Sequence, residues 1–270
     1  MPFVNNDIWT LCITPTANAR PLWAEWSLAP EILAPFVAGV ALYTYGSRRQ
    51  PGRAVAFAGW AVLGLALFSP ICRLAAGLVS AHMIQLALLS IVAPALLAAG
   101  GAASALKAGA QATLNSKRRF SGPDLPLSVP AFVYGAAIWL WHAPPIYNAT
   151  LTNPALHVAV MFGIVLASMW FFQRALAGTP SSNGAAILAL LVTMTHTGLL
   201  GATLTFAPQP LYAADDLALA TWGLTAKSDQ QLAGLIMWAP SGLLYLVAAL
   251  VLIARMIAAP AIGEQAGERL

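Results

Sequence analysis

Four histidines are the first candidates for chemistry in this chain, because all of them fall in or beside long apolar stretches. His82 opens the run "AHMIQLALLSIVAPALL", His142 and His157 flank "APPIYNATLTNPAL", and His196 interrupts "VTMTHTGLLGATLTF". An ionisable group is costly in apolar surroundings, so its presence there indicates either a functional site or a hydrogen bond between helices.

Thioether side chains occur in the same stretches. Met83 follows His82 directly, and Met161 lies four residues after His157. Residues four apart share one face of a helix, so His157 and Met161 can point at one site. Imidazole and thioether are suitable copper ligands, and thioether favours Cu(I). The predicted metal ligands are His82, His142, His157, His196, Met83, Met161 and Met237.

The same kinds of residue can also have purely structural roles. A buried histidine can hydrogen-bond across helices, and methionine commonly fills gaps in a core. Asp229 begins the last apolar stretch, where it can complement the dipole of that helix. Small residues permit close contact between helices, and the expected positions are Gly198, Gly201 and Gly234.

The elements that must position these residues are membrane helices. The 270-residue chain is 59% hydrophobic and 8% charged, with a mean hydropathy of +0.74, which excludes an ordinary soluble domain for most of its length. About 17 to 25 apolar residues cross ~30 Å of hydrocarbon as a helix. We expect an all-α, seven-transmembrane-helix bundle that forms a single domain over residues 1–270. The expected spans are 30–46, 54–71, 76–99, 127–142, 154–176, 184–206 and 230–257.

The basic residues predict the orientation of this bundle. With seven spans, ten of the thirteen lysines and arginines fall on one side, and such loops are usually cytoplasmic. The N-terminus is therefore expected outside and the C-terminus in the cytoplasm, in a multi-pass protein of a bacterial plasma membrane. The net charge of +4 reflects these loops, and no nucleic-acid partner is expected. The inner residues are Arg48, Arg49, Arg53, Lys107, Lys117, Arg118, Arg119, Arg174, Arg255 and Arg269; the outer ones are Arg20, Arg73 and Lys227.

The outer side would carry both cysteines and an aromatic belt. Cys12 and Cys72 would face an oxidising compartment, where they can form a disulfide or contribute thiolates to a metal site. Tryptophans are enriched at membrane boundaries, and those expected here are Trp23, Trp26, Trp139 and Trp141. The N-terminal segment has no basic residue before its first apolar residues and no unbroken apolar core, so a cleaved signal peptide is not expected.

Three blocks of the sequence resemble one known family. They are "HMIQLALLSIVAPALL", "WLWHAPPIYNATLTNPALH" and "THTGLLGATLTFAPQPLY…WGLTAKSDQQLAGLIMW", and in this order they resemble the signature regions of the CtaG family of cytochrome c oxidase assembly factors. The resemblance extends from about residue 75 to residue 258. It implies a seven-helix membrane protein, not an enzyme, that helps mature the copper centres of haem-copper oxidases, with the copper A site as the favoured target. The implied partner is the oxidase subunit that carries a copper centre.

The family pattern falls on residues in all three blocks. The positions are His82, Met83, Gln85, Trp141, His142, Pro144, His157, His196, Gly198, Asp229, Gln230, Gly234, Met237 and Trp238. Two features differ, since Leu86 replaces a second histidine that the family commonly has, and Val160 and Met161 replace a frequent Glu-His pair. These differences remove an i, i+4 histidine pair, for which Met161 can substitute in part.

The expected function is to bind or deliver copper, as Cu(I), on the outer side of the membrane during assembly of an oxidase. Three alternatives use the same residues. Two histidines at similar depth on different helices can ligate haem from both sides, which would make a membrane electron carrier. A copper transporter would need ligands that continue into the inner half of the membrane. A structural scaffold would use the histidines only as hydrogen-bond donors between helices.

Overall fold

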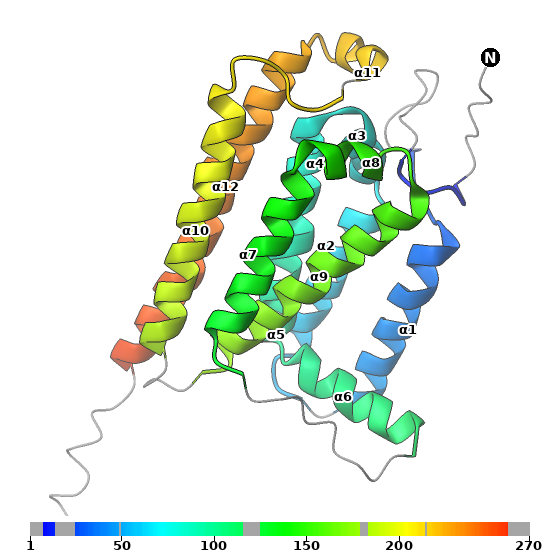
Figure 1. Cartoon of the computed structure of the whole chain (residues 1–270). Helices are drawn as coiled ribbons and strands as arrows, with labels where there is room; N and C mark the ends of the chain where they lie inside the picture. The colour runs from blue at the N-terminus through cyan, green and yellow to red at the C-terminus, as the bar shows by residue number, and fades with distance from the viewer. Residues whose placement is uncertain are drawn as a thin grey trace, which may run out of the picture.

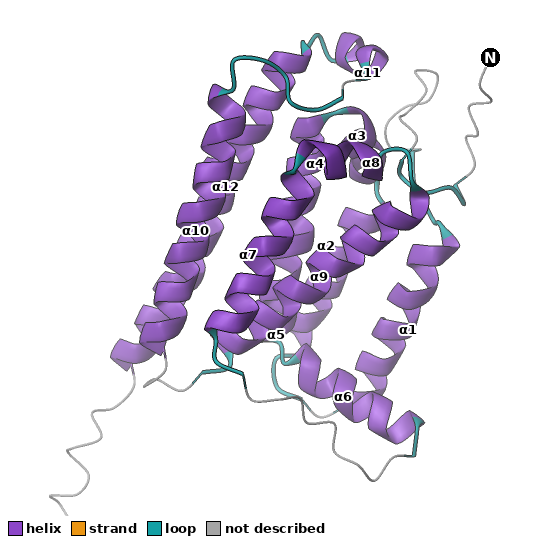
Figure 2. Cartoon of the chain, viewed as in Figure 1, coloured by secondary structure: helices purple, strands orange, loops and turns teal. Residues whose placement is uncertain are grey.

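The structure is a computed structural model, and it describes residues 8–13, 25–48, 50–115, 125–178, 183–213 and 215–258. Within these ranges every regular element is a helix and no strand occurs (Figure 2), so the all-α prediction is confirmed. The helices are α1 (Pro30–Gly46), α2 (Arg53–Phe68), α3 (Pro70–Gly77), α4 (Val79–Ala87), the π-helical turn η2 (Leu88–Val92), α5 (Ala93–Ala99), α6 (Ala102–Thr113), α7 (Ser128–His142), α8 (Pro144–Thr150), α9 (Pro154–Leu176), α10 (Asn183–Phe206), α11 (Asp216–Thr221) and α12 (Ala226–Ala258).

Each of the seven expected spans coincides with one helix or a run of consecutive helices. Four are long and apolar enough to cross a membrane, namely Val79–Ala99, which joins α4, η2 and α5, and the helices α9, α10 and α12. α2 and α3, bent by 47° to each other, form a fifth candidate. α1 has 17 residues and α7 has 15, so each measures about 22–26 Å at 1.5 Å per residue. The described helices thus supply four or five candidate spans, and the seven-span topology stays a prediction.

The helices form one bundle with two distinct ends. α10 and α12 run side by side along one edge, α1 lies at the opposite edge, and the other long helices lie between them (Figure 1). The short helices α3, α8 and α11 lie at one end, here called the α8 end, and α6 lies across the other, the α6 end (Figure 1). Large apolar side chains are exposed on the long helices, which suits a lipid surrounding. Examples are Leu166, Leu188, Leu199 and Leu243.

Basic residues concentrate at the α6 end. Those described there are Arg48, Arg53, Lys107, Arg174 and Arg255. At the α8 end they are Arg73 and Lys227. Cytoplasmic loops are enriched in lysine and arginine, so this distribution agrees with a cytoplasmic α6 end. Arg20, Arg49, Lys117, Arg118, Arg119 and Arg269 lie outside the described residues, as does Trp23.

Three glycines let α10 and α12 approach closely. A Cβ atom on Gly201 would lie 2.9 Å from the carbonyl oxygen of Gly234, and one on Gly234 would lie 2.6 Å from the backbone nitrogen of Thr205. A Cβ on Gly198 would lie 3.2 Å from the ring of Trp238. Any larger residue would push the helices apart, so the predicted contact role of these glycines is confirmed.

A group of buried aromatic side chains fills the middle of the bundle. The hydroxyl of Tyr134 donates to the carbonyl of Ser90 in the π-helical turn at 2.9 Å, and it lies 2.6 Å from the hydroxyl of Tyr245. Phe171 and Phe172 pack against the Tyr134 ring, with centroids at 5.3 and 6.3 Å. We call this group, Tyr134, Phe171, Phe172 and Tyr245, the aromatic plug.

Candidate metal centre

His82 lies near the start of α4, at the α8 end, where two aromatic rings hold it. The rings of Trp141 and Tyr147 meet the imidazole edge-on, with centroids at 5.2 and 5.0 Å. The imidazole hydrogen-bonds to the backbone of Ala75, and its Nε2 has no hydrogen-bond partner in the described part of the chain. Trp141 is only 3% exposed, so it belongs to this core and not, as predicted, to an outer aromatic belt. Trp26 and Trp139 are exposed.

His142 ends α7, and its hydrogen bond fixes the tautomer. Its Nδ1 lies 2.7 Å from the carbonyl oxygen of Ile138. A carbonyl oxygen only accepts, so in the neutral ring Nδ1 carries the proton and Nε2 keeps an open lone pair. This Nε2 lies 3.4 Å from the sulfur of Met83. A thioether sulfur is also an acceptor, so neither atom can donate to the other, and a soft cation between them would satisfy both.

His157 lies in the first turn of α9. The turn is fixed by Asn153, whose side chain accepts a hydrogen bond from the backbone nitrogen of Leu156 at 3.1 Å. The imidazole hydrogen-bonds to the backbone of Thr150, and its Nε2 has no partner among the described residues. Met161 lies one turn further along α9 and is buried. The predicted shared face of His157 and Met161 is confirmed, because both line one cavity.

The three buried histidines form one group, the histidine cluster of His82, His142 and His157. Met83, the neighbour of His82, meets His142, and α8 supplies both the Tyr147 ring beside His82 and the Thr150 backbone that bonds His157. Each ring hydrogen-bonds to a backbone group, and its Nε2 takes no part in that bond. This arrangement is common in metal-binding histidines. No three His, Cys, Asp or Glu side chains of the described residues already lie within reach of one ion.

Met83 and Met237 line one small cavity beside the cluster. Its volume is about 20 Å³, and polar atoms of Ser90 and Ser241 also reach its wall. The two methionines come from α4 and α12, so their contact with one cavity could not be predicted from their spacing in the sequence. Tyr245 closes this cavity, and the rest of the aromatic plug lies beyond it.

His196 lies apart from the cluster. Its Nδ1 accepts a hydrogen bond from Nε1 of Trp139 at 3.2 Å, so the neutral ring carries its proton on Nε2. The side chain is half-buried and lines a largely apolar cavity of about 740 Å³ between α7 and α10, here called the α7–α10 groove. Neither His82, His142 nor His157 lines this groove. The structure therefore does not bring the fourth predicted histidine together with the other three.

Asp229 supports the cluster from α12. Its carboxylate accepts hydrogen bonds from the backbone nitrogens of Val79 at 2.7 Å and Ser80 at 3.1 Å, and from the Ser80 hydroxyl. It thus caps α4, the helix that carries His82, whereas the sequence assigned it to the dipole of its own helix. Gln85 is also structural, since its amide donates to the carbonyl of Ala66 at 2.9 Å.

The segment between α10 and α12 covers the cluster at the α8 end. Tyr212 donates a hydrogen bond to the carbonyl of His142 at 2.9 Å, and its ring lies 4.3 Å from that of Tyr147. Gln230 accepts a hydrogen bond from the backbone nitrogen of Leu211 at 2.6 Å, which holds the segment in place. Burial raises the pKa of Tyr212 above its usual range, so the hydroxyl stays a neutral donor. Neither tyrosine is among the residues predicted from the sequence.

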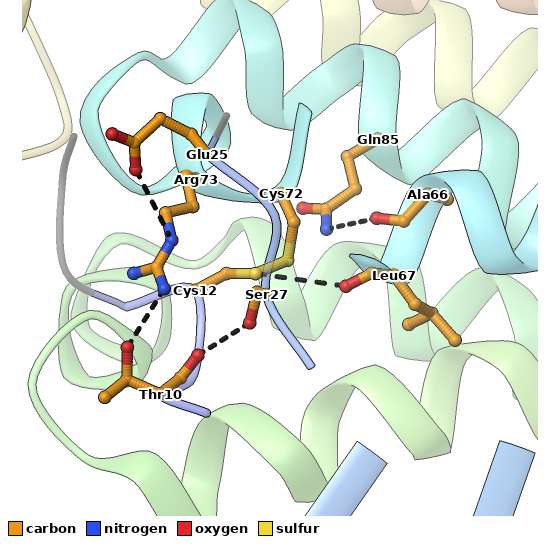
Figure 3. Close-up of a disulfide and its surroundings, with 9 residues drawn as sticks. All are labelled: Thr10, Cys12, Glu25, Ser27, Ala66, Leu67, Cys72, Arg73 and Gln85. Carbon is orange, nitrogen blue, oxygen red and sulfur yellow. Dashed lines mark hydrogen bonds and ion pairs between the residues drawn. A yellow bond between two sulfur atoms is a disulfide. The ribbon is translucent and has the colours of Figure 1, made fainter. Parts of the chain in front are cut away.

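Cys12 and Cys72 form a disulfide at the α8 end, with Cα atoms 5.5 Å apart (Figure 3). This pairing decides between the two roles that the sequence leaves open, at least for the oxidised protein. Arg73, next to Cys72, donates to the hydroxyl of Thr10 at 3.0 Å and lies 3.9 Å from a carboxylate oxygen of Glu25 (Figure 3). The N-terminal segment is therefore joined to α3 by one covalent bond and by polar contacts.

Comparison with known proteins identifies the family of the chain. A family model described as "Cytochrome c oxidase caa3 assembly factor (Caa3_CtaG)" matches residues 35–259. No curated protein and no solved structure matches the chain. The matched range includes the histidine cluster, both methionines beside it and Asp229. The chain therefore belongs to the cytochrome c oxidase caa3 assembly factor family, as its resemblance in sequence predicts.

Proposed function

We propose that this oxidase assembly factor binds Cu(I) in the histidine cluster and passes it to the oxidase subunit that carries a copper centre. Membership of the family supports a role in oxidase assembly, and the cluster supports the choice of copper. The observation that carries the proposal is the approach of Nε2 of His142 to the sulfur of Met83 at 3.4 Å. These are two buried acceptors with no proton to share, and both are ligands that suit Cu(I).

The remaining cluster residues have defined parts in this proposal. His82 and His157 would supply further imidazole ligands through their open Nε2 atoms. Backbone hydrogen bonds already orient their rings, which reduces the rearrangement needed to bind an ion. Trp141 and Tyr147 shield His82 from water. Because all of these ligands are neutral, the apolar interior would gain only the single charge of Cu(I).

The proposal places the α8 end on the outer side of a bacterial plasma membrane, with seven spans in total. The described basic residues support this direction, because they concentrate at the α6 end. The disulfide supports it as well, since disulfides persist mainly in oxidising compartments. α1 and α7, the two shorter helices, would span the bilayer with some local thinning of the lipid.

The aromatic plug favours delivery on one side over transport across the membrane. Met83 and Met237 line the small cavity beside His142, and Tyr245 is part of its wall. The hydroxyls of Tyr134 and Tyr245 are hydrogen-bonded to each other, and both side chains are at most 1% exposed. An ion that reached this cavity would meet packed aromatic rings between it and the α6 end.

The cavity sizes favour a single ion over haem. The cavity of about 10 Å³ is lined by His157, and the cavity of about 20 Å³ is lined by Met83, next to His142. Each has room for about one or two water molecules. A porphyrin needs far more space between its two axial histidines. The α7–α10 groove has the volume, about 740 Å³, but His196 is the one histidine in its wall.

The test is the copper content of the oxidase in a strain that lacks this gene. We expect the purified oxidase to keep its haem and lose copper, and the wild-type gene to restore the copper. The triple variant His82→Ala/His142→Ala/His157→Ala should fail to restore it, whereas His196→Ala should succeed. Immunoblots of the membranes must show equal amounts of each variant. Full restoration of copper by the triple variant would refute the proposal.

A further inference from the structure

The disulfide shares a small cavity with two of the predicted metal ligands. The cavity is about 10 Å³ in volume, and its wall includes Cys12, Cys72, His157 and Met161, so it has room for about one water molecule or ion. His157 is only 7% exposed, and its Nε2 has no hydrogen-bond partner in the described residues. A buried polar atom without a partner is costly, and here its residue lines a cavity together with the disulfide and a thioether.

We propose that reduction of the Cys12–Cys72 disulfide creates a second Cu(I) site, made of the two cysteine thiolates, His157 and Met161. Thiolate and thioether are the softest protein ligands and select Cu(I). In the disulfide the two sulfurs are bonded to each other and cannot act as thiolates, so the site exists only in the reduced protein. This inference rests on the proposed copper function and adds a redox condition to it.

The chemistry requires an external dithiol as reductant. One thiolate of the dithiol attacks a sulfur of the disulfide, and the mixed disulfide is then resolved by the second thiol. Cys12 and Cys72 become thiols, and the dithiol leaves as its own disulfide. When Cu(I) binds, the two cysteines release two protons to the solvent, and the oxidation state of the copper does not change.

The charge near the disulfide suits a thiolate site. Two thiolates and one Cu(I) carry a net negative charge, which is costly in a buried place unless a positive charge lies nearby. Arg73 is adjacent to Cys72, is 4% exposed and points its guanidinium toward Thr10 and Glu25 on the same side (Figure 3). Its positive charge, which already faces the Glu25 carboxylate, would be shared between that carboxylate and the added thiolates.

The surrounding hydrogen bonds would hold the segment in place after reduction. The Ser27 hydroxyl donates to the carbonyl of Thr10 at 2.6 Å, and the Ser27 backbone nitrogen donates to the carbonyl of Phe68 at 2.9 Å. The backbone nitrogen of Leu28 donates to the carbonyl of Ile8 at 2.5 Å. The two cysteines would therefore stay close enough to bind one ion without the covalent bond.

His157 connects this site to the histidine cluster. It lines the disulfide cavity, and it hydrogen-bonds to Thr150 of α8, the helix whose Tyr147 packs against His82. An ion held by the thiolates could move to the imidazoles by exchanging one ligand at a time, with His157 common to both places. Thiol–disulfide exchange with an external disulfide, which leaves as a dithiol, would then re-form the Cys12–Cys72 bond, remove the thiolates and prevent return of the ion.

The test compares oxidised and reduced protein in anaerobic Cu(I) titrations against a chromophoric Cu(I) chelator. One sample of the full chain in detergent stays oxidised, and the other is treated with dithiothreitol and desalted. We expect the reduced sample to bind one more Cu(I) per chain, held by the thiolates, His157 and Met161, while His82, His142 and Met83 keep the first ion. The X-ray absorption spectrum of the copper should then show added sulfur neighbours. Cys12→Ser/Cys72→Ser, carried through both treatments, should match the oxidised wild type.

A second variant separates a metal site from a purely structural disulfide. Met161→Leu keeps the volume of the side chain, and we expect it to weaken the added site about tenfold, equivalent to ~1.4 kcal/mol. If reduction lowers the melting temperature but adds no copper, the inference is wrong. If the oxidised protein binds no copper at all, it is the proposed function that fails, and the two outcomes are thus distinguishable.

Discussion

Imidazole side chains occur in two regions of the molecule, the histidine cluster and the α7–α10 groove, and their hydrogen bonds have opposite senses. In the cluster, Nδ1 of His142 donates to a backbone carbonyl and leaves Nε2 open. In the groove, Nδ1 of His196 accepts from Trp139, so Nε2 carries the proton. His142 can bind a cation through Nε2 without losing a bond, whereas His196 would first have to give up its bond to Trp139 and move its proton.

The cavities beside the two regions also differ, and the difference again favours the cluster as a metal site. Aromatic rings pack against His82 in the cluster, and the small cavities beside the cluster, of about 10 and 20 Å³, are lined by His157 with Met161 and by Met83 with Met237. The groove is about 740 Å³, largely apolar, and has no cysteine or methionine in its wall. A histidine in an apolar span is therefore not enough to identify a metal ligand. The partner of its second nitrogen and the donors beside it decide the assignment.

Replacing Asp229 with alanine should have the largest effect, because it disrupts the cluster and not the groove. The backbone nitrogens of Val79 and Ser80 would lose their acceptor in a buried place, at a cost of about 1–3 kcal/mol each. We expect a clearly lower melting temperature in detergent and loss of copper binding. Asp229→Asn keeps one acceptor oxygen, so its melting temperature should lie between those of the wild type and Asp229→Ala. An unchanged melting temperature of Asp229→Ala would show that the cap is unimportant.

Replacing Met83 with leucine should affect binding more than stability. The side chains have similar volumes, so the expected loss of stability is under about 1.5 kcal/mol. The thioether next to Nε2 of His142 would be gone, and we expect about tenfold weaker Cu(I) binding, ~1.4 kcal/mol. Met194→Leu, on α10, is the matched control and should bind as the wild type does. Equal affinities of Met83→Leu and the wild type would remove Met83 from the site.

Replacing Gly135 with alanine should have the smallest effect and tests the independence of the groove. The added Cβ would lie 3.0 Å from Nε2 of His196, so the imidazole must shift slightly. Alanine favours the helix by up to about 1 kcal/mol over glycine, which offsets this crowding. We expect a change in melting temperature of a few degrees at most and unaltered copper binding. Loss of copper in this variant would mean that the groove and the cluster act together.

Much of the fold could be predicted because its signals are local. Each apolar run of the sequence became a helix within a few residues, since the hydrophobic length of a segment is a property of that segment alone. The cap at Asn153 and the close approach at Gly201 are equally local. The position of a residue along its helix is local as well: His82 and His157 lie in the first turns of their helices, and His142 is the last residue of its helix.

Relations between distant segments could not be predicted. Asp229 caps a helix that begins 150 positions earlier in the chain, and no pattern around Asp229 indicates which helix it will meet. His196 faces α7 on the side of the groove, because the rotation of a helix depends on its packing. Tyr147 and Tyr212 reach the cluster from connecting segments, whose paths follow no hydrophobic periodicity.

The most direct test of the central claim is the copper bound per chain after anaerobic purification of His142→Ala and His196→Ala beside the wild type. His142→Ala removes an imidazole with an open Nε2, and His196→Ala removes one whose Nδ1 is engaged by Trp139. We expect His142→Ala to lose most of its copper and His196→Ala to retain it. If His142→Ala keeps all of its copper, or His196→Ala loses as much, the histidine cluster is not the copper site.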